Sequence, residues 1–383
     1  MAASEFMREA LSEAARAQGT TAPNPPVGAV VVSAGEVVGR GHTQPPGGDH
    51  AEVGALREAG GRARGATLYV TLEPCSHFGR TPPCADALIA AGVAAVRYAV
   101  EDPDAQVSGR GGEALRAAGV EAVEGDGAEE ASYQLAGYLK HRRTGLPLVV
   151  VKFAASLDGR IAAASGDSRW VSGPETLRWA HEQRPLIDAI VVGSNTVVVD
   201  DPRLTARPGG SSEGVHQPLR VVLDSRGRTP EDAAVLGGEA ATLVATTQAS
   251  AVEWRERMAA RGAELLVLPA AGGHVDIEAL LRELGARGML TVLFEGGGIV
   301  LGSLFDRRLV DRVHAVIAPL VIGASDAPSA VAGVGVQRMA QAPRLREVTV
   351  ERLGDDTLIS GVPVWPDGDG DDNDGAGDGG GER

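Results

Sequence analysis

The chain of 383 residues contains only two cysteines, Cys75 and Cys84. This number is too small for the disulfide framework of a secreted protein and is typical of a reducing compartment, where thiolates can serve as metal ligands. A single disulfide between the two is the alternative. Aromatic residues make up only 3% of the chain, so its cores must be built mainly from Val, Leu, Ile and Ala.

Long apolar runs are also missing. The runs at Val27–Val32 and Leu148–Val151 are far shorter than the roughly 20 residues that a membrane span requires. The N-terminal stretch MAASEFMREA carries charges and is not followed by the apolar segment of a secretory signal. We therefore expect a cytoplasmic protein that does not bind membranes.

The chain lacks a positive charge balance, because 51 acidic residues outnumber 36 basic ones and give a net charge of −15. The segment Asp367–Arg383 holds seven acidic residues and one arginine and contributes −6, which leaves −9 on the rest of the chain. An acidic surface repels phosphate backbones, so we expect no nucleic-acid partner. The C-terminal segment has too few apolar residues to fold, which predicts an acidic, Gly/Asp-rich disordered tail at 366–383.

Apolar periodicity predicts an α/β organisation with two domains. In the first, strands alternate with helices, and the predicted strands are Val27–Ser33, Thr67–Leu72, Ala94–Val100 and Val120–Val123. The predicted helices are Glu5–Ala17, Ala51–Ala59, Ala85–Ala91, Glu113–Ala118 and Glu129–Arg142. Gly145 and Pro147 follow the last helix and predict a boundary between domains at 1–145 and 146–365.

The second domain repeats the alternation. Its predicted strands are Leu148–Phe153, Ala189–Val192, Arg220–Leu223, Thr242–Ala245, Glu264–Leu268, Thr291–Phe294 and Arg312–Ile317. Its predicted helices are Glu175–Glu182, Ala251–Arg261 and Ile277–Arg287. Ser172 and Glu175 have the spacing of a capping box at the start of the first of these helices.

One group of residues carries recognisable chemistry. His50, Cys75 and Cys84 offer one imidazole and two thiolates, which are ligands that zinc accepts. Three protein ligands leave the fourth position for water, as in catalytic zinc sites. Glu52 lies two residues from His50, where its carboxylate can take the proton of that water and return it to a leaving nitrogen. His-x-Glu followed by Pro-Cys is the signature of zinc-dependent nucleobase deaminases.

The second half of that signature has an unusual spacing. Eight residues separate Cys75 from Cys84 where the signature has two, so a loop must return the second thiolate to the metal. Pro82 and Pro83 stiffen that loop and place Cys84 at a predicted helix start, where the helix dipole favours a thiolate. His42 and His77 lie near the group and are predicted to be substrate contacts or structural residues.

Longer strings resemble a known family. They are Pro23-Asn-Pro-Pro-Val-Gly-Ala-Val30, His50-Ala-Glu-Val53, Thr71-Leu-Glu-Pro-Cys-Ser-His-Phe-Gly-Arg-Thr-Pro-Pro-Cys84, Lys152-Phe-Ala-Ala-Ser-Leu-Asp-Gly-Arg160, Gly166-Asp-Ser-Arg-Trp170, Gly193-Ser-Asn-Thr196, Asp200-Asp-Pro-Arg-Leu-Thr-Ala-Arg207 and Phe294-Glu-Gly-Gly-Gly298. Together they resemble the bifunctional pyrimidine deaminase/reductase family of riboflavin biosynthesis, in the family's order and over about residues 5 to 364.

The resemblance implies a fold and two reactions. It implies a cytidine-deaminase-like zinc domain followed by a dihydrofolate-reductase-like domain. The first would remove the ring C2 amine of a diaminopyrimidinone ribosyl 5′-phosphate by hydrolysis, and the second would use NADPH to reduce the ribosyl side chain to ribityl. The expected partner is thus a phosphorylated pyrimidine. We also expect a homo-oligomer, although no sequence pattern specifies the number of subunits.

The same resemblance implies binding residues. Asn24 would contact the pyrimidine in the deaminase, with a simple turn residue as the alternative. The implied NADPH contacts are Ala154, Trp170, Thr196, Asp200, Ser225, Gly297, Gly298, Ile299, Val300, Leu301, Gly302 and Ser303. The implied substrate contacts of the reductase are Ser168, Arg184, Leu204, Arg207 and Glu295. The alternatives are core packing for Trp170 and solvated surface charges for the two arginines.

Two features of the second domain have a physical rationale of their own. No G-x-G-x-x-G follows its first strand, but Gly296–Gly298 follow a later strand and precede a predicted helix, where bare amides can hold phosphate. An ordinary strand-to-helix turn is the alternative. Lys152 ends an apolar strand, where a cation is costly unless it meets substrate or a carboxylate such as Glu295 or Asp200. We therefore predict that Lys152 polarises the substrate.

Other functions remain open at this point. One is a deaminase of the same fold that acts on cytidine, guanine or a tRNA base, although the acidic body disfavours tRNA. Another is a binding module with a structural zinc, which would require a fourth protein ligand that no third cysteine supplies. In a third, only one of the two halves is active.

Overall fold

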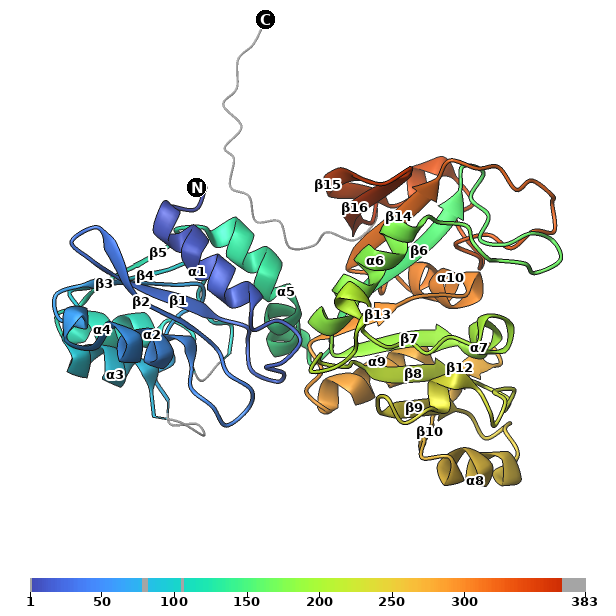
Figure 1. Ribbon diagram of the computed structural model, residues 1–383, viewed down its shortest axis with the longest axis horizontal. Coiled ribbons are helices and arrows are strands. Elements are labelled where there is room, and N and C mark those ends of the chain that lie inside the picture. Colours follow the sequence, from blue (N-terminus) through green and yellow to red (C-terminus); the bar gives the residue numbers. More distant parts are fainter. Residues whose placement is uncertain (1, 78–81, 105–106, 367–383) are drawn as a thin grey trace, which may run out of the picture.

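The computed structural model describes residues 2–77, 82–104 and 107–366. The described chain forms two lobes, each built around one large β-sheet, as Figure 1 shows. We call the elements from α1 to α5 the N-terminal lobe and those from β6 to β16 the C-terminal lobe. The predicted tail at 366–383 lies outside the described residues apart from Pro366.

The N-terminal lobe has a five-stranded sheet in the order β2-β1-β3-β4-β5. The strands are β1 (Gly28–Ser33), β2 (Glu36–His42), β3 (Thr67–Val70), β4 (Ala95–Tyr98) and β5 (Glu121–Glu124). The helices are α1 (Glu5–Ala15), α2 (Ala51–Ala59), α3 (Cys84–Ala91), α4 (Arg110–Ala117) and α5 (Ala128–Thr144). Strand β1 pairs antiparallel with β2 and β3, whereas β3, β4 and β5 are parallel.

Helices cover both faces of this sheet. In Figure 1, α1 and α5 lie on one face and α2, α3 and α4 on the other. Strand β1 is therefore buried on both sides, which explains its continuous apolar sequence. Glycines allow the helices to approach closely: a Cβ at Gly28 would lie 2.0 Å from the Ala10 carbonyl oxygen of α1, and one at Gly41 would lie 2.1 Å from that of Ala51 in α2.

The C-terminal lobe has a nine-stranded sheet in the order β10-β9-β8-β7-β13-β6-β14-β16-β15. Its strands are β6 (Leu148–Ser156), β7 (Ala189–Gly193), β8 (Leu219–Leu223), β9 (Thr242–Thr246), β10 (Glu264–Val267), β13 (Thr291–Phe294), β14 (Arg312–Ala318), β15 (Arg344–Leu353) and β16 (Asp356–Val364). A separate ribbon joins β11 (Ala270–Ala271) to β12 (His274–Val275). The helices are α6 (Pro174–Gln183), α7 (Ser194–Asp200), α8 (Val252–Ala260), α9 (Ile277–Ala286) and α10 (Gly298–Asp306).

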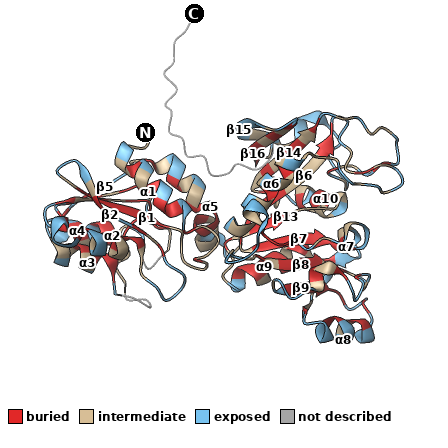
Figure 2. Cartoon of the chain, in the orientation of Figure 1, coloured by how far each residue is buried: buried red, intermediate tan, exposed pale blue. Residues whose placement is uncertain are grey.

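Two apolar cores lie on opposite faces of the nine-stranded sheet. One face packs Val149, Val151 and Phe294 against α9 and α10, and the other packs Val150 and Val192 with side chains that include those of α8. Figure 2 shows these buried residues concentrated in the strands of both lobes, while the outer turns of α8 are exposed. Burial on both faces gives β6, β7 and β13 the near-continuous apolar sequences of parallel strands.

The predicted α/β class is confirmed, and the predicted strands and helices appear in their predicted order. The patterns did not predict β2, β15, β16 or α7. The capping box is wrong: the N-cap of α6 is Gly173, and the Asp356 carboxylate of β16 accepts hydrogen bonds from the Gly173 amide and the Thr176 hydroxyl. Asp356 therefore anchors the start of α6 to β16, and no described side chain caps the helix in the way that we predicted for Ser172.

The two lobes touch through α5 and the turn before β1. Lys140 of α5 forms an ion pair with Asp311, and a ring nitrogen of His141 lies 2.9 Å from the Gly285 carbonyl oxygen. Helix α5 ends at Thr144 and β6 begins at Leu148. The division at 145 and 146 remains a prediction. Among the described residues, none of the helices combines the length and apolar character needed to cross a bilayer.

Candidate active sites

The predicted zinc ligands come from three neighbouring segments of the N-terminal lobe. His50 is the N-cap residue of α2, Cys75 follows β3, and Cys84 is the first residue of α3. Two of the three ligands thus stand at helix N-termini, where the helix dipole stabilises negative charge on a thiolate. The Cys84 amide lies 3.3 Å from the Cys75 sulfur and donates to it, which fixes the return of the chain after the loop.

The three ligand atoms are close enough to share one metal ion. His50 Nδ1 lies 3.2 Å from Cys84 Sγ and 3.7 Å from Cys75 Sγ, and all three atoms lie within 4.8 Å of one another. Both cysteines are free thiols, so the alternative of a disulfide is wrong. One imidazole and two thiolates suit zinc and leave a coordination position for water. The side chains therefore fit the predicted metal.

The protonation of the cluster is also that of a metal site. A hydrogen bond from Cys84 lowers the pKa of Cys75 to about 4, whereas the same pairing and burial raise the pKa of Cys84. One proton is thus shared where a cation would sit. Burial, together with the negative charge on Cys75, raises the pKa of Glu52 to about 7. A carboxyl with a pKa near 7 can both accept and donate a proton at neutral pH.

The sequence analysis missed a buried carboxylate beside this cluster. Glu73 is 3% exposed and accepts hydrogen bonds from the amides of Gly111 and Gly112 at 2.8 and 3.0 Å. It also accepts from the amide of Asp102. Glu73 therefore ties the segment that presents Cys75 to the start of α4. Its position two residues before the predicted zinc ligand Cys75 could have indicated that Glu73 lies close to the site.

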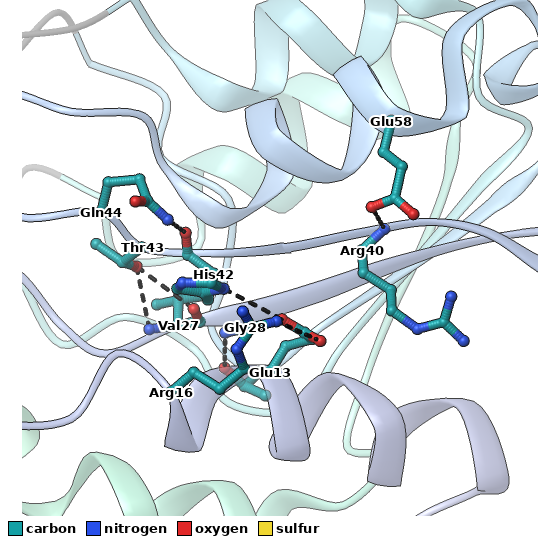
Figure 3. A network of polar contacts seen from close by, with 10 residues as sticks. Glu13, Arg16, Val27, Gly28, Arg40, His42, Thr43, Gln44 and Glu58 are labelled. Carbon is teal, nitrogen blue, oxygen red and sulfur yellow. Dashed lines mark hydrogen bonds and ion pairs between the residues drawn. The ribbon is translucent and has the colours of Figure 1, made fainter.

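His42 lies in a different polar network, which Figure 3 shows at the edge strand β2. Its Nδ1 lies 3.1 Å from the Glu13 carboxylate of α1, which also pairs with Arg16 at 2.9 Å. The Arg40 amide donates to Glu58 of α2. Helices α1 and α2 thus both bind β2 through side-chain contacts. A groove of about 670 Å³ lies beside these contacts. This arrangement supports the structural reading of His42.

Asn24 lies in a tight turn before β1. Its amide donates to the Thr21 carbonyl at 2.8 Å, and the Thr21 hydroxyl donates back to the Asn24 carbonyl at 3.0 Å. Strand β1 begins four residues later, and the Gly28 amide donates to Thr71 at the end of β3. The turn therefore lies at the sheet edge that also presents Cys75. These hydrogen bonds use only the backbone of Asn24, so they leave its side chain available for substrate.

A cluster of charged side chains lies at the centre of the C-terminal lobe. Lys152 of β6, Arg184 after α6 and Glu295 after β13 come together, and Arg184 pairs with Glu295 at 2.7 Å. Burial lowers the pKa of Lys152, opposed by the charge on Glu295. Burial alone would raise the pKa of Glu295, but Arg184 and Lys152 reverse this effect and lower it. The cluster therefore places an Arg–Glu ion pair beside a buried amine, an arrangement that can orient a polar ligand.

A second arginine extends this cluster. A guanidinium nitrogen of Arg207 lies 3.4 Å from a ring nitrogen of His181, and Arg184 donates to the Thr205 carbonyl at 3.0 Å. Burial lowers the pKa of His181, and the positive charges of Arg184 and Arg207 act in the same direction. The structure thus brings Arg184, Arg207 and Glu295 together, with Leu204 buried beside them. We did not predict His181, although its position three residues before Arg184, in the last turn of the predicted helix, was a usable signal.

The predicted NADPH contacts gather at the ends of neighbouring parallel strands. A Cβ at Gly296 or Gly297 would lie 3.3 or 3.7 Å from the Thr196 hydroxyl of α7. The Ser168 hydroxyl donates to Asp200 at 2.6 Å, so a predicted substrate contact and a predicted NADPH contact touch. The turn after β13 has positive φ at Gly296 and Gly297, which only glycine adopts readily. Helix α10 starts at Gly298, so the glycine turn does open a helix.

The remaining predicted NADPH contacts have varied positions. Trp170 is 70% exposed, so the alternative of core packing is wrong for it. Ala154 lies in β6 two residues after Lys152. Ser225 lies beyond β8, and its hydroxyl accepts a hydrogen bond from the Val275 amide at 2.9 Å. In α10, Ile299 is 64% exposed whereas Leu301 is buried, so the two cannot contact a ligand in the same way.

Family models match both lobes. The model described as the cytidine and deoxycytidylate deaminase zinc-binding region matches residues 1–100, and the RibD C-terminal domain matches residues 147–359. The latter model covers more than half of the chain. These matches confirm the predicted order, in which a cytidine-deaminase-like zinc domain is followed by a reductase domain of the dihydrofolate-reductase-like class.

Full-length relatives agree with the family models. The chain is 41% identical to the riboflavin biosynthesis protein RibD of Escherichia coli K12, over 92% of this chain and 97% of the relative. It is 42% identical to RibD of Mycobacterium tuberculosis H37Rv, over 93% and 96%. The solved structure of Acinetobacter baumannii RibD superposes with a TM-score of 0.83 at 35% identity, covering 94% of this chain and 98% of that one.

A third structure carries a more detailed description. The Thermotoga maritima protein, described as a diaminohydroxyphosphoribosylaminopyrimidine deaminase/5-amino-6-(5-phosphoribosylamino)uracil reductase, superposes with a TM-score of 0.82 at 33% identity. The match covers 94% of this chain and 98% of that one. Because relatives above 30% identity align over nearly the whole length, the predicted resemblance is confirmed, and the chain belongs to the RibD family of riboflavin biosynthesis proteins.

Proposed function

We propose that this chain is a bifunctional enzyme of riboflavin biosynthesis. Its N-terminal lobe deaminates 2,5-diamino-6-(5-phosphoribosylamino)pyrimidin-4(3H)-one to 5-amino-6-(5-phosphoribosylamino)uracil. Its C-terminal lobe then reduces the ribosyl side chain to ribityl phosphate with NADPH. The observation that carries the proposal is the presence in one chain of both assembled clusters: a zinc-compatible site with a buried acid, and a Lys–Arg–Glu site beside a glycine turn.

The deamination depends on Glu52. Zinc held by His50, Cys75 and Cys84 would polarise a water molecule for attack on the pyrimidine C2. Glu52 is 4% exposed, and its pKa of about 7 allows it to take the proton of that water and pass it to the departing amine. Asn24 contacts the pyrimidine ring and keeps C2 facing the metal. Glu52 is suited to this role because it lies in the first turn of α2, two residues after the ligand His50, and interacts with both cysteines.

The reduction depends on the cluster of Lys152, Arg184 and Glu295. NADPH supplies the hydride to C1′ of the ribosyl group. Lys152 polarises the sugar, because its amine is buried and lies near the carboxylate of Glu295. Glu295 and Arg184 hold polar groups of the substrate, and Arg207 is the guanidinium best placed for the phosphate, since its pairing partner is a histidine rather than a carboxylate. Ser168 and Leu204 complete the substrate contacts.

We propose that NADPH binds at the ends of the same parallel strands, on the side opposite the substrate. The glycine turn and the start of α10 would hold the pyrophosphate, since amides at a helix N-terminus bind phosphate. Thr196 and Asp200 of α7 would contact the nearby ribose, and the exposed Trp170 ring would cover the cofactor from solvent. Ala154 and Ser225 would line the ends of the site.

The test separates the two reactions. We would incubate the purified protein with the diaminopyrimidinone ribosyl phosphate, with and without NADPH, and measure ammonia release and the nicotinamide absorbance band. We expect ammonia in both samples and nicotinamide oxidation only when substrate and NADPH are both present. Ammonia release without nicotinamide oxidation would show that the protein is a deaminase only. The absence of both signals would contradict the proposal.

Two further features belong to the proposal. We propose a cytoplasmic location, supported by the free thiols that must stay reduced to bind metal. We also propose a homo-oligomer, supported by β15, an edge strand of ten residues on which Val348 and Val350 are 49% and 65% exposed. Light scattering measures the oligomer directly, and a monomer at assay concentration would contradict it.

A further inference from the structure

The turn that carries Asn24 is held by the other lobe. A Cβ at Gly288, in the turn between α9 and β13, would lie 2.9 Å from the Pro23 Cβ. A Cβ at Gly19 would lie 2.0 Å from the Pro185 carbonyl oxygen in the 3₁₀ turn Arg184–Leu186. Both ends of the segment Gly19–Asn24 are therefore in close contact with the C-terminal lobe. Neither contact leaves space for a methyl group on the glycine.

This segment is also stiff. The two hydrogen bonds between Thr21 and Asn24 close it into a compact turn. Thr21 is 2% exposed, so the turn is packed as well as bonded. On the outer side, the Arg142 guanidinium donates to the Pro23 carbonyl at 3.2 Å and pairs with Asp104 at 3.5 Å. A displacement of Pro23 must therefore move Asn24, the next residue, and not merely bend the chain between them.

The support on the reductase side is firm. Gly288 leads directly into β13, which pairs with both β6 and β7 in the centre of the nine-stranded sheet. Pro185 directly follows Arg184, whose guanidinium is fixed by Glu295 and by the Thr205 carbonyl. Since a central strand and an ion pair hold these two contact points, the Asn24 turn is the part that yields when the contact is strained.

From these contacts we infer that Gly288 and Pro23 form a positioning contact through which the reductase lobe sets the place of Asn24 in the deaminase site. The inference rests on the proposed contact between Asn24 and the pyrimidine. The contact orders the turn before substrate arrives, so that less ordering accompanies binding. It also makes the deaminase site incomplete without the C-terminal lobe, although the metal ligands and Glu52 all come from the N-terminal lobe.

The chain contains a matched pair of glycines for the test. Gly288 and Gly262 both follow a helix C-cap residue, with φ of +81° and +88°. Their amides make equivalent bonds, to Gly285 at 2.8 Å and to Ala259 at 2.9 Å. A Cβ at Gly262 would meet nothing within 4 Å. Gly288→Ala and Gly262→Ala therefore share the local cost of positive φ, and only the first pushes on Pro23.

We would measure both reactions and the zinc content in each full-length variant. In Gly288→Ala, we expect the deaminase KM to rise about 5–10-fold above that of Gly262→Ala, because displacements well below 1 Å already weaken a positioned contact. Zinc content and reductase kcat/KM should match those of Gly262→Ala. Equal deaminase KM values in the two variants would overturn the inference.

Two further variants make every outcome decisive. If Gly288→Ala loses reductase activity as well, it is remade in Pro23→Gly, which removes the Cβ that the new methyl group would meet. A deaminase KM that Gly288→Ala raises as strongly in Pro23→Gly as in the unaltered chain would then overturn the inference. Asn24→Ala tests the underlying assignment. If Asn24→Ala leaves KM unchanged, the proposed pyrimidine contact is wrong and the inference falls with it. If it raises KM while Gly288→Ala behaves as Gly262→Ala, only the inference falls.

Discussion

The two active sites of this chain are assembled in opposite ways. The zinc cluster takes all its side chains from residues 50–84, at two helix N-termini and one strand end within one sheet edge. The reductase cluster joins residues far apart, since 111 positions separate Arg184 from Glu295. The first site depends on rare ligands held by local structure, and the second on common residues that only the complete nine-stranded sheet brings together.

This difference has a physical consequence. A metal ion supplies its own binding energy, so three ligands at roughly correct positions are sufficient to organise the site. An ionic cluster has no such organiser, and each of its buried charges is costly unless the others are in place. Changes in the zinc cluster should therefore abolish one activity cleanly, while changes in the reductase cluster should affect both binding and turnover.

The largest effect should come from removing a metal ligand. Cys84→Ser replaces a thiolate with a hydroxyl that zinc binds poorly, so we expect zinc content to fall below one per chain and deamination to drop by about 10⁴-fold or more. Metal analysis and ammonia release measure the two effects. Reductase turnover on the deaminated substrate should stay unchanged and is the control. Full zinc occupancy in the variant would show that Cys84 is not a ligand.

The next largest effect should come from Glu52→Gln. This change keeps the size of the side chain but removes its ability to carry a proton, so we expect a loss in deaminase kcat of about 10³-fold, within the usual range for general acid–base catalysis. Zinc should remain bound, which distinguishes this variant from Cys84→Ser. A variant that keeps both zinc and full deamination would contradict the proton-transfer role.

A smaller effect is expected on the reductase side. Lys152→Ala removes the proposed polarising ammonium, and we expect reductase kcat to fall by about 10²-fold. Because Glu295 keeps its partner Arg184, the lobe should remain folded and deamination should remain intact. Stopped-flow measurement of nicotinamide oxidation gives the rate. Unchanged reductase turnover, with deamination intact, would exclude the role that we assign to Lys152.

The sequence predicted the local site better than the distant one. The zinc ligands could be recognised because soft ligands are rare in this chain. In addition, the order His50, Cys75, Cys84 is that of the zinc deaminase signature. Glu73 was missed because it binds the amides of Gly111 and Gly112, and a backbone amide has no residue signature. His181 was missed for a related reason, since its partner Arg207 is one of many basic residues.

The strands that the sequence patterns missed show the same limit of prediction from sequence. Strand β2 contains Gly39 and Gly41, which poorly favour a strand but are needed because a Cβ at either would lie about 2 Å from a carbonyl oxygen of α2. Strand β15 has mostly exposed residues, so it lacks the apolar alternation by which strands are recognised. The patterns were clearest in strands buried on both faces, such as β6 and β7, because burial there requires a near-continuous apolar sequence.

The smallest effect on activity, and the finest test of the comparison, concerns a buried acid at the junction of the two lobes. Asp102 is 4% exposed and accepts a hydrogen bond from the Tyr138 hydroxyl of α5 at 3.0 Å. Burial raises its pKa from 3.8 to about 6. The folded state therefore keeps a proton that the unfolded chain releases, and the stability this adds is lost as the pH rises from about 4 to 6.

We expect this loss to amount to about 3 kcal/mol at neutral pH, since each pKa unit corresponds to about 1.4 kcal/mol. Asp102→Asn keeps an acceptor for Tyr138 but cannot ionise, so its stability should not show that dependence. Denaturant unfolding of both proteins between pH 4 and pH 7 should give curves that diverge as the pH rises, with the variant the more stable at pH 7. Parallel curves would mean that Asp102 ionises at little cost, and that the N-terminal lobe, like the reductase cluster, stabilises its buried charges with partners.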